Sequence, residues 1–259
     1  MTIDTTQART EAAVDAYMGS MRELFSVIPH GRWEDGRDLV RYSTGLRAPR
    51  FNGLCVLGPS ADEQRAAAWL ADLADAGTPR CILARPTAPD WVGDLAARHG
   101  LTDVDREPLM LHEDPASVTV PATPVIEPID PDDPQDVATG QLVFADGFGG
   151  PVEVLGPLMA AEVLRIPGNT GWIGRVDAAA VTVGFGAVRA GHVGVFNIAT
   201  PEAHRRRGYG RAVTAQTVAA GVAAGAHTAY LQASAMGYPV YERMGFRTAE
   251  TWRGHYPGA

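Results

Sequence analysis

A stretch rich in arginine and glycine, residues 205–211, has the residue types of an anion-binding site. It reads Arg-Arg-Arg-Gly-Tyr-Gly-Arg and runs into an alanine-rich segment that predicts a helix over residues 208–224. Glycines before a helix let the backbone approach a ligand closely, and the first N–H groups of the helix carry partial positive charge. The arginine side chains add charge at the rim. We therefore predict a phosphate site here; a tight turn that binds nothing is the alternative.

A strand must bring the chain to this bend. Residues 193–199 are apolar and β-prone, with Phe196 and Ile198 on one face. Thr200 and Pro201 end the run, because proline cannot donate to a ladder and restricts the residue before it. The order strand, bend and helix predicts that the bend lies at the carboxyl end of the strand.

Two common nucleotide-binding patterns do not fit the bend. A P-loop requires Gly-Lys-Ser/Thr, but the sequence contains no lysine, so all 22 basic residues are arginine. The dinucleotide pattern requires a third glycine where Val213 stands. The pattern that remains is Arg/Gln-x-x-Gly-x-Gly/Ala.

A second motif follows this pattern at a suitable distance. After a predicted strand at residues 229–234, the chain reads Tyr-Glu-Arg-Met-Gly-Phe over residues 241–246. The two motifs in this order resemble the GNAT acetyltransferase superfamily, specifically over residues 125–256. The resemblance implies an α/β fold with a mixed sheet, acetyl-CoA as co-substrate and an amine of a small molecule or peptide as acceptor.

The resemblance also implies roles for individual residues. Backbone N–H groups of residues 206–211 would bind the pyrophosphate, and the main chain at residues 198–200 would pair with the pantetheine arm and polarise the thioester carbonyl. Tyr241 would act as general acid toward the departing sulfur, or its ring would simply pack under the cofactor. Many family members have an asparagine where Ser234 stands here, so that contact would be weaker. The predicted cofactor residues are Ile198, Ala199, Thr200, Arg205, Arg206, Arg207, Gly208, Tyr209, Gly210, Arg211 and Ser234.

The general base and the acceptor pocket are less determined by the sequence. The candidate general bases are Glu153, Asp146 and Asn197, the last only as a residue that holds a water molecule. His192 is expected in a turn and His204 in the basic rim beside the arginines. Proton transfer through solvent water without a dedicated base is the alternative. We expect the pocket between the loop at residues 146–156, the far side of the sheet and residues 252–256. Its possible lining residues are Phe148, Trp172, Trp252 and Tyr256.

Composition limits the remaining function classes. The chain has 259 residues, 46% hydrophobic and 20% charged, which is typical of a globular protein. The net charge of −8 argues against general nucleic-acid binding. No apolar run is long enough for a membrane span, and residues 1–13 are too polar for a secretory signal, so we expect a cytoplasmic protein without membrane partners, as a monomer or homodimer. Cys55 and Cys81 lack metal-ligand spacing, and we expect buried, reduced thiols and no metal.

The first half predicts a second α/β domain. Residues 9–27 are expected to form a helix, residues 31–42 a hairpin or loop, and Leu54–Leu57 a strand. Ser60 with Glu63 forms a capping box for a helix that ends near Ala76. A strand at residues 80–84, a helix at 90–99 and a strand near 106–113 follow. This half resembles a degenerate GNAT domain, as in tandem members; an unrelated α/β cap is the alternative.

These patterns divide the chain into residues 1–113, an N-terminal α/β domain, a proline-rich linker at 114–124, and residues 125–259, a catalytic domain. In the second half we expect a strand at 125–130, a helix from Asp133 to about Ala145, a helix at 157–166 and antiparallel strands at 171–176, 179–189 and 193–199. The other hypotheses are a non-catalytic acyl-CoA-binding or regulatory protein, and an interaction module that uses the arginine cluster.

Overall fold

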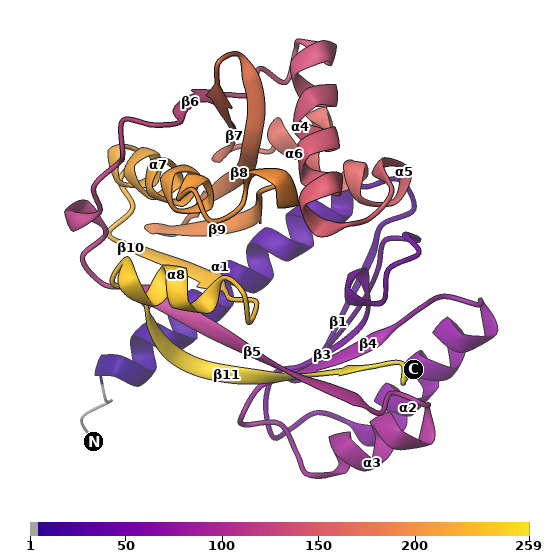
Figure 1. Cartoon of the computed structure of the whole chain (residues 1–259). Coiled ribbons are helices and arrows are strands. Elements are labelled where there is room, and N and C mark those ends of the chain that lie inside the picture. Colours follow the sequence, from indigo (N-terminus) through magenta and orange to yellow (C-terminus); the bar gives the residue numbers. More distant parts are fainter. Residues whose placement is uncertain (1–4, 259) are drawn as a thin grey trace. The chain divides into compact units, whose positions relative to one another are not determined.

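The computed structural model describes residues 5–258 (Figure 1). The first four residues and Ala259, which fall within the predicted domains 1–113 and 125–259, lie outside the described residues. The chain forms two compact units: unit 1 holds the residues up to Leu24 together with Met110–Ala249, and unit 2 holds Phe25–Leu109 together with the residues from Glu250 on. The α/β fold class with a mixed sheet is confirmed.

The sheet of unit 1 is the meander that the sequence predicts. Strands β6 (Val125–Pro128), β7 (Asn169–Val176), β8 (Ala179–Arg189) and β9 (His192–Ala199) pair antiparallel in that order. Ala190 and Gly191 form the turn between β8 and β9, both with positive φ. Strand β10 (Thr228–Gln232) then pairs parallel to β9 after a helical crossover.

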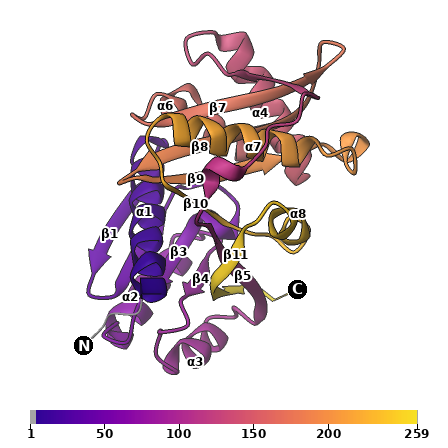
Figure 2. The ribbon, with the colours of Figure 1, turned by 90° about the vertical axis from the view of Figure 1, so that its left-hand side faces the viewer.

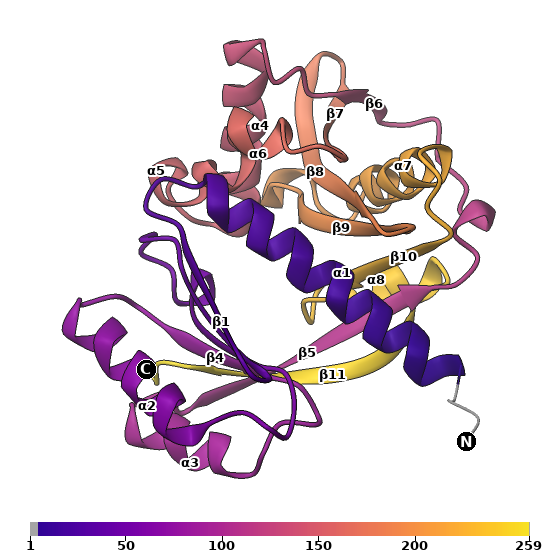
Figure 3. The ribbon, with the colours of Figure 1, turned by 180° about the vertical axis from the view of Figure 1, so that it is seen from behind.

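Two helices cover opposite faces of this sheet. The crossover helix α7 (Tyr209–Ala223) packs against Val193, where Gly221 brings the helix so close that a Cβ atom on it would lie 2.4 Å from the valine Cβ. On the other face lies the part of α1 (Thr5–Val27) that belongs to unit 1, with the Tyr17 ring stacked on Phe196 at 6.1 Å. Figure 2 shows α7 along β8 and β9, and Figure 3, seen from behind Figure 1, shows α1 in front.

The remaining helices of unit 1 are short except α4 (Pro134–Phe148). Asp133 caps α4 as predicted, since its side chain accepts from the Gln135 N–H and Pro134 is the first helical residue. The single helix expected at 157–166 is wrong: the chain forms a 3-10 turn and a separate four-residue helix, because Ala160 is extended with ψ 159°. The other elements are α5 (Val152–Leu155), η3 (Gly156–Met159), α6 (Ala161–Leu164), η4 (Glu202–His204), α8 (Tyr238–Arg243) and η2 (Pro115–Ser117).

Unit 2 repeats the same order of elements. Strands β1 (Arg32–Gly36), β2 (Leu39–Ser43) and β3 (Asn52–Val56) are antiparallel, with η1 (Pro49–Phe51) before β3. Helix α2 (Glu63–Asp75) crosses over to β4 (Cys81–Ala84), which pairs parallel to β3, and α3 (Trp91–Arg98) follows. A meander, a helix, a parallel strand and a further helix thus occur in each unit.

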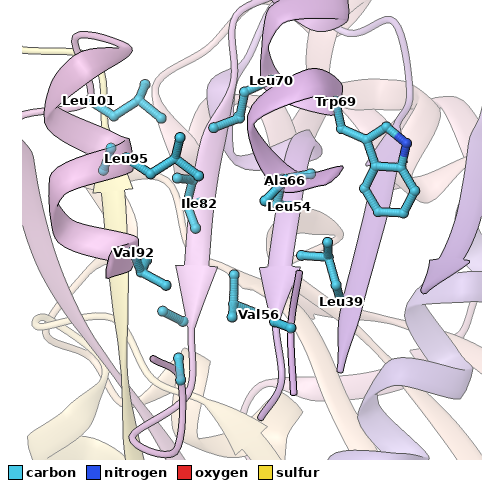
Figure 4. Packing of buried hydrophobic residues seen from close by; sticks show 14 residues of the cluster. Leu39, Leu54, Val56, Ala66, Trp69, Leu70, Ile82, Val92, Leu95 and Leu101 are labelled. Carbon is cyan, nitrogen blue, oxygen red and sulfur yellow. The ribbon is translucent and has the colours of Figure 1, made fainter. Parts of the chain in front are cut away.

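The core of unit 2 lies between its two helices and one face of its strands. Figure 4 shows Leu70 of α2 and Leu95 of α3 on the side of the strands that carries Leu54 and Ile82, and Trp69 of α2 beside Leu39. Cys55 and Cys81 are buried free thiols, as expected. Burial raises the pKa of the Cys81 thiol to about 12 and also raises that of Cys55.

The predicted start of α2 is wrong by two residues. Asp62, not Ser60, is the N-cap, and its side chain accepts from the backbone N–H of Arg65 at 2.8 Å. The Ala61 N–H donates to the Gly58 carbonyl at 3.4 Å, so the chain makes a turn at Ser60 before the helix begins. A carboxylate two residues later displaces the serine as cap.

Two long strands contribute residues to both units. Strand β5 (Asp103–His112) reaches from unit 2 into unit 1 at Met110, and β11 (Arg247–Tyr256) reaches from unit 1 into unit 2 at Glu250. In unit 2, β11 pairs antiparallel with β4 through Arg253 and Ala84. The division into a degenerate and a catalytic domain at residues 113 and 125 stays a prediction.

Candidate functional site

The bend predicted as an anion site lies between the end of β9 and the start of α7. After η4, Arg206 and Gly208 both adopt positive φ, 62° and 81°. Gly208 is the N-cap of α7, and no heavy atom lies within 4 Å of the position that a Cβ atom would take on it. The left-handed conformation favours glycine, and the open space leaves the backbone accessible.

The backbone N–H groups of this bend are unused. In the described part of the chain, none of the six N–H groups from Arg206 to Arg211 donates to a protein acceptor, and Ala212 is the first to do so, to the Gly208 carbonyl at 3.0 Å. No side chain of the described residues caps the helix, and the first turn of α7 holds no acidic residue. Six adjacent donors at the positive end of a helix dipole can bind a phosphate or pyrophosphate group.

Three arginines add positive charge at the same place. Arg206, Arg207 and Arg211 are exposed, and none forms an ion pair with another described residue. A cation near a helix N-terminus opposes the dipole and costs about 0.3–1 kcal/mol. An anionic ligand would offset that cost and gain from the arginines as well.

Arg205 has a different environment from its neighbours. Its Nε donates to the Thr200 carbonyl at 3.1 Å, and its Nη2 donates to the Gly147 carbonyl at the end of α4 at 2.9 Å. The side chain is half-buried. Its guanidinium group therefore holds two backbone segments, while its backbone leads into the bend.

Strand β9 separates from its neighbours just before the bend. Pairing with β10 extends from His192 to Gly194 and does not continue in the described structure. On the β8 side the register shifts between Phe196 and Ala199, and Asn197 has φ 54°, which marks a β-bulge. The edge of β9 that faces β10 is therefore free of ladder hydrogen bonds at Ile198 and Ala199.

The carbonyl groups at the end of β9 already have protein donors. The Ala199 carbonyl accepts from the Thr182 hydroxyl at 2.9 Å, and the Thr200 carbonyl accepts from Arg205. The Thr182 and Thr200 hydroxyls also form a 2.9 Å hydrogen bond. These contacts fix the backbone of two of the three predicted pantetheine residues.

Tyr241 is brought from α8 to the N-terminal half of α7. Its ring packs edge-on against Phe246, with 6.1 Å between ring centroids. Burial raises the pKa of its phenol to about 12, and a hydrogen bond with the Thr214 side chain partly opposes the shift. Thr214 in turn donates to the Gly210 carbonyl at 2.8 Å. The predicted acid Tyr241 is therefore hydrogen-bonded to the same turn of α7, residues 210–214, that borders the predicted anion site.

Ser234 is occupied in capping the turn before α8. Its hydroxyl oxygen accepts from the Gly237 N–H at 3.1 Å, and its carbonyl accepts from the Tyr238 N–H at 2.9 Å. The hydroxyl hydrogen remains available to a ligand. Ser234 itself is exposed.

The candidate bases are scattered within unit 1. Asp146 and Glu153 are exposed, and His192, which is buried, pairs with the Thr228 hydroxyl at the opposite end of β9 from the bend. Burial lowers the pKa of His192, and the nearby His227 adds to this shift. Asn197 lies at the bulge, where its side-chain amide donates to the Leu158 carbonyl at 3.0 Å. Of these groups, Asn197 is the one next in sequence to the residues predicted to pair with the pantetheine arm.

The four aromatic residues proposed for the acceptor pocket lie in different environments. Phe148 is 57% exposed and packs on Phe144, whereas Trp172 is 8% exposed and its indole N–H has no hydrogen-bond partner among the described residues. Trp252 and Tyr256 belong to unit 2, where they donate to Glu250 and Glu107, respectively. The pocket stays a prediction.

Sequence reasoning missed Asn197 as a bulge residue and Arg205 as a contact between segments. A β-bulge has no clear sequence signal. A hydrogen bond from a side chain to a carbonyl far away in the sequence has no sequence signal either. The described residues contain no group of His, Cys, Asp or Glu side chains that could hold a metal ion. Among them there is also no helix long and apolar enough to cross a membrane.

No family model and no curated protein matches the sequence. Several solved structures share its fold along most of the chain. A GCN5-related N-acetyltransferase from Kribbella flavida superposes with a TM-score of 0.64, at 18% identity over 94% of this chain and 96% of that one. The chain has the GNAT acetyltransferase fold.

Two further GNAT structures superpose over comparable lengths. A GCN5-related N-acetyltransferase from Sphaerobacter thermophilus gives a TM-score of 0.57 at 15% identity, covering 87% of this chain and 83% of that one. A tandem GNAT protein from the clavulanic acid biosynthesis pathway gives 0.55 at 14% identity, covering 96% of each chain. The predicted GNAT resemblance is thus confirmed at the level of the fold.

Proposed function

We propose that the protein is an acetyl-CoA-dependent N-acetyltransferase that acts on an amine of a small molecule or peptide. The observation that carries the proposal is the set of six N–H groups from Arg206 to Arg211 without an acceptor in the described part of the chain, beside three arginines that form no ion pair there. This set suits the pyrophosphate of coenzyme A in charge and in hydrogen bonding. The GNAT fold of neighbours named as acetyltransferases supports the same reading.

The free edge of β9 would hold the rest of the donor. The pantetheine arm would pair with the main chain at residues 198–200, next to the bulge, and a backbone N–H there would polarise the thioester carbonyl. Preorganised donors of this kind stabilise the oxyanion that forms as the amine attacks. The contacts to the Ala199 and Thr200 carbonyls keep this backbone in place.

The transfer itself forms one bond and breaks one. A neutral amine attacks the carbonyl carbon, the new C–N bond forms, the C–S bond breaks, and the nitrogen loses one proton to solvent. Tyr241 donates to the departing sulfur and is reprotonated from solvent. With its pKa raised to about 12, the phenol is fully protonated at physiological pH and ready to donate.

Calorimetric titration with acetyl-CoA tests the cofactor site. We expect micromolar binding to the wild type and its loss in an Arg206→Ala/Gly208→Val variant, which removes a charge and fills the bend. Arg165→Gln is the matched control, because Arg165 forms an exposed ion pair with Asp132 elsewhere in unit 1. No binding to the wild type would refute the proposal.

An amine screen that follows release of the free thiol then tests turnover. Binding without release for any amine would leave a non-catalytic acyl-CoA-binding protein as the better account. We further expect the enzyme to act in the cytoplasm, as a monomer or homodimer, without nucleic-acid or membrane partners. These expectations come from the sequence and are separate from the site.

A further inference from the structure

The segment from Gly147 to Leu158, which we call the tethered segment, is tied at both ends to residues of the cofactor site. At its start the Gly147 carbonyl accepts from Arg205 at 2.9 Å. At its end the Leu158 carbonyl accepts from the Asn197 side-chain amide at 3.0 Å. One tether therefore comes from the residue before the bend, and the other comes from the β-bulge.

The segment has little structure of its own to keep it in place. It contains α5 and most of η3, each four residues long, and four glycines, of which Gly149 is left-handed with φ 69°. Helices this short are not stable alone, and each glycine adds backbone freedom. A third hydrogen bond, from Gln141 to the Gly156 carbonyl at 3.1 Å, ties the segment to α4 and not to β9.

Close packing makes the Arg205 tether sensitive to small shifts. A Cβ atom on Gly147 would lie 2.8 Å from the Ala199 Cβ and 2.9 Å from the Thr200 nitrogen, so the end of α4 lies directly on the end of β9. Arg205 donates to the Thr200 carbonyl at the same point. A change in the backbone around the bend therefore reaches the start of the tethered segment through the Arg205 side chain as well as through this packing.

We infer that Arg205 is a positioning residue that couples occupation of the bend to the order of the tethered segment. The inference rests on the proposed function, in which coenzyme A fills the bend and the segment forms part of the acceptor wall. Binding of the cofactor restricts the motion of the backbone that carries Arg205. The hydrogen bond from Arg205 to the Gly147 carbonyl then restricts the motion of the tethered segment. Cofactor and acceptor then bind with positive coupling, and each raises the affinity of the other by the same factor.

Hydrogen–deuterium exchange with coenzyme A as the ligand tests the coupling. In the wild type, we expect exchange of the amides at residues 147–158 to slow by about fivefold or more when coenzyme A is added. In Arg205→Lys, which keeps the charge but lacks the forked guanidinium, we expect the slowing to be lost at coenzyme A concentrations that saturate the variant. Equal slowing in both proteins with ligand bound would overturn the inference.

Two further variants separate coupling from general loss of structure. Gly147→Ala leaves Arg205 intact but forces the end of α4 away from β9, so it should also lose the ligand-induced slowing. Arg165→Gln removes another arginine that donates to a backbone carbonyl, that of Pro131, and should behave as the wild type. A purely structural role for Arg205 would lower protection in the free protein without changing the ligand response.

Failure of the proposed function gives a distinct result. If coenzyme A does not bind the wild type, the proposed function is refuted. The Arg205 tether is then tested by comparing hydrogen exchange in the ligand-free wild type and variant. Residues 147–158 should then exchange faster in Arg205→Lys than in the wild type, and equal rates would overturn the tether as well.

Discussion

The carboxylate of Asp38 accepts a hydrogen bond from the backbone N–H of Ser60 at 2.9 Å. Ser60 lies in the turn before α2, the element of unit 2 that corresponds in order to α7 of unit 1. The same carboxylate occupies the space next to Gly58, where a Cβ atom would lie 2.7 Å from its Oδ2. Asp62 and Glu63 then begin the helix. In unit 2 the protein's own carboxylates take the place that an anionic ligand would need.

We therefore predict that each chain binds one acetyl-CoA molecule, in unit 1. Three carboxylates at the turn before α2 would repel a pyrophosphate, whereas the bend before α7 has none in its first turn. Calorimetric titration should give a stoichiometry of one per chain. A stoichiometry of two would mean that Asp38 moves away and that unit 2 also binds the cofactor.

Gly208 and Gly210 should respond oppositely to alanine substitution. Gly208→Ala places a side chain at φ 81° and should destabilise the free protein by about 1–2 kcal/mol. Gly210→Ala lies inside α7, where the new Cβ would be 3.5 Å from the Thr200 hydroxyl, an ordinary contact. Alanine is the better helix former by up to about 1 kcal/mol, so this variant should be more stable.

Acetyl-CoA affinity should separate the same two variants. Loss of one backbone hydrogen bond to a charged phosphate is worth about 1.5–3 kcal/mol, so Gly208→Ala should weaken binding by about tenfold or more. Thermal denaturation and titration measure the two effects independently. Equal affinities for the two variants would mean that the bend does not hold the phosphates.

Replacing Tyr241 by phenylalanine should lower turnover by about 10²–10⁴-fold while leaving acetyl-CoA affinity nearly unchanged. Tyr238→Phe is the matched control, because this tyrosine lies on the same helix and its hydroxyl contacts Thr248 at 3.1 Å. If the two variants turn over equally, Tyr241 has only a packing role.

The pH profile adds an independent check on Tyr241. The acid must be protonated to act, and its pKa is raised from 10.0 to about 12, so protonation is lost only as the pH rises toward 12. We expect the rate to rise as the amine loses its proton and then to stay level through pH 10. A fall in rate centred near pH 10 in the wild type would contradict burial of the acid.

The buried ion pair of Arg85 and Glu250 in unit 2 should be costly to break from one side. Their Nε to Oε1 distance is 2.8 Å, the side chains are 6% and 10% exposed, and Trp252 donates to the same Oε1 at 2.6 Å. Arg85→Met leaves a buried carboxylate and should cost about 3–5 kcal/mol in unfolding free energy.

The double variant Arg85→Met/Glu250→Leu should recover part of that loss, since no charge is left buried. Arg98→Met removes an exposed pair with Glu63, 55% and 43% exposed, and should cost about 1 kcal/mol or less. Urea denaturation measures all three. A double variant less stable than Arg85→Met would contradict this account.

The bend was predictable because its determinants are local. Glycines before a helix and arginines at fixed spacing are consecutive in the sequence, as are the antiparallel strands around Gly191 and their turn, and the structure adds the positive φ of Gly208 and the uncapped helix start. The start of α2 was predicted wrongly because Ser60 and Asp62 are both suitable N-cap residues, and the local sequence does not show which of the two caps the helix. Asn197 and Asp38 depend on partners far away in the sequence.

Which chain segments belong to each unit could not be predicted from local sequence patterns, for the same reason. The helix predicted near residues 9–27 forms, as α1, but its residues up to Leu24 pack in unit 1 through contacts such as that of the Tyr17 hydroxyl with Gln232 at 2.8 Å. No periodicity within the helix identifies the strand that it will cover. Such pairings depend on the whole chain.

The two strands that supply residues to both units constrain how the protein can be made. Residues from Glu250 on pair with β4 in unit 2, so unit 2 has no complete sheet while the ribosome is still translating unit 1. Helix α1 likewise cannot bury the Tyr17 side chain until β9 and β10 have been synthesised. Unit 2 therefore cannot finish folding until unit 1 has been synthesised, so a gene fragment that encodes only the first half should yield a chain that chaperones retain and proteases remove.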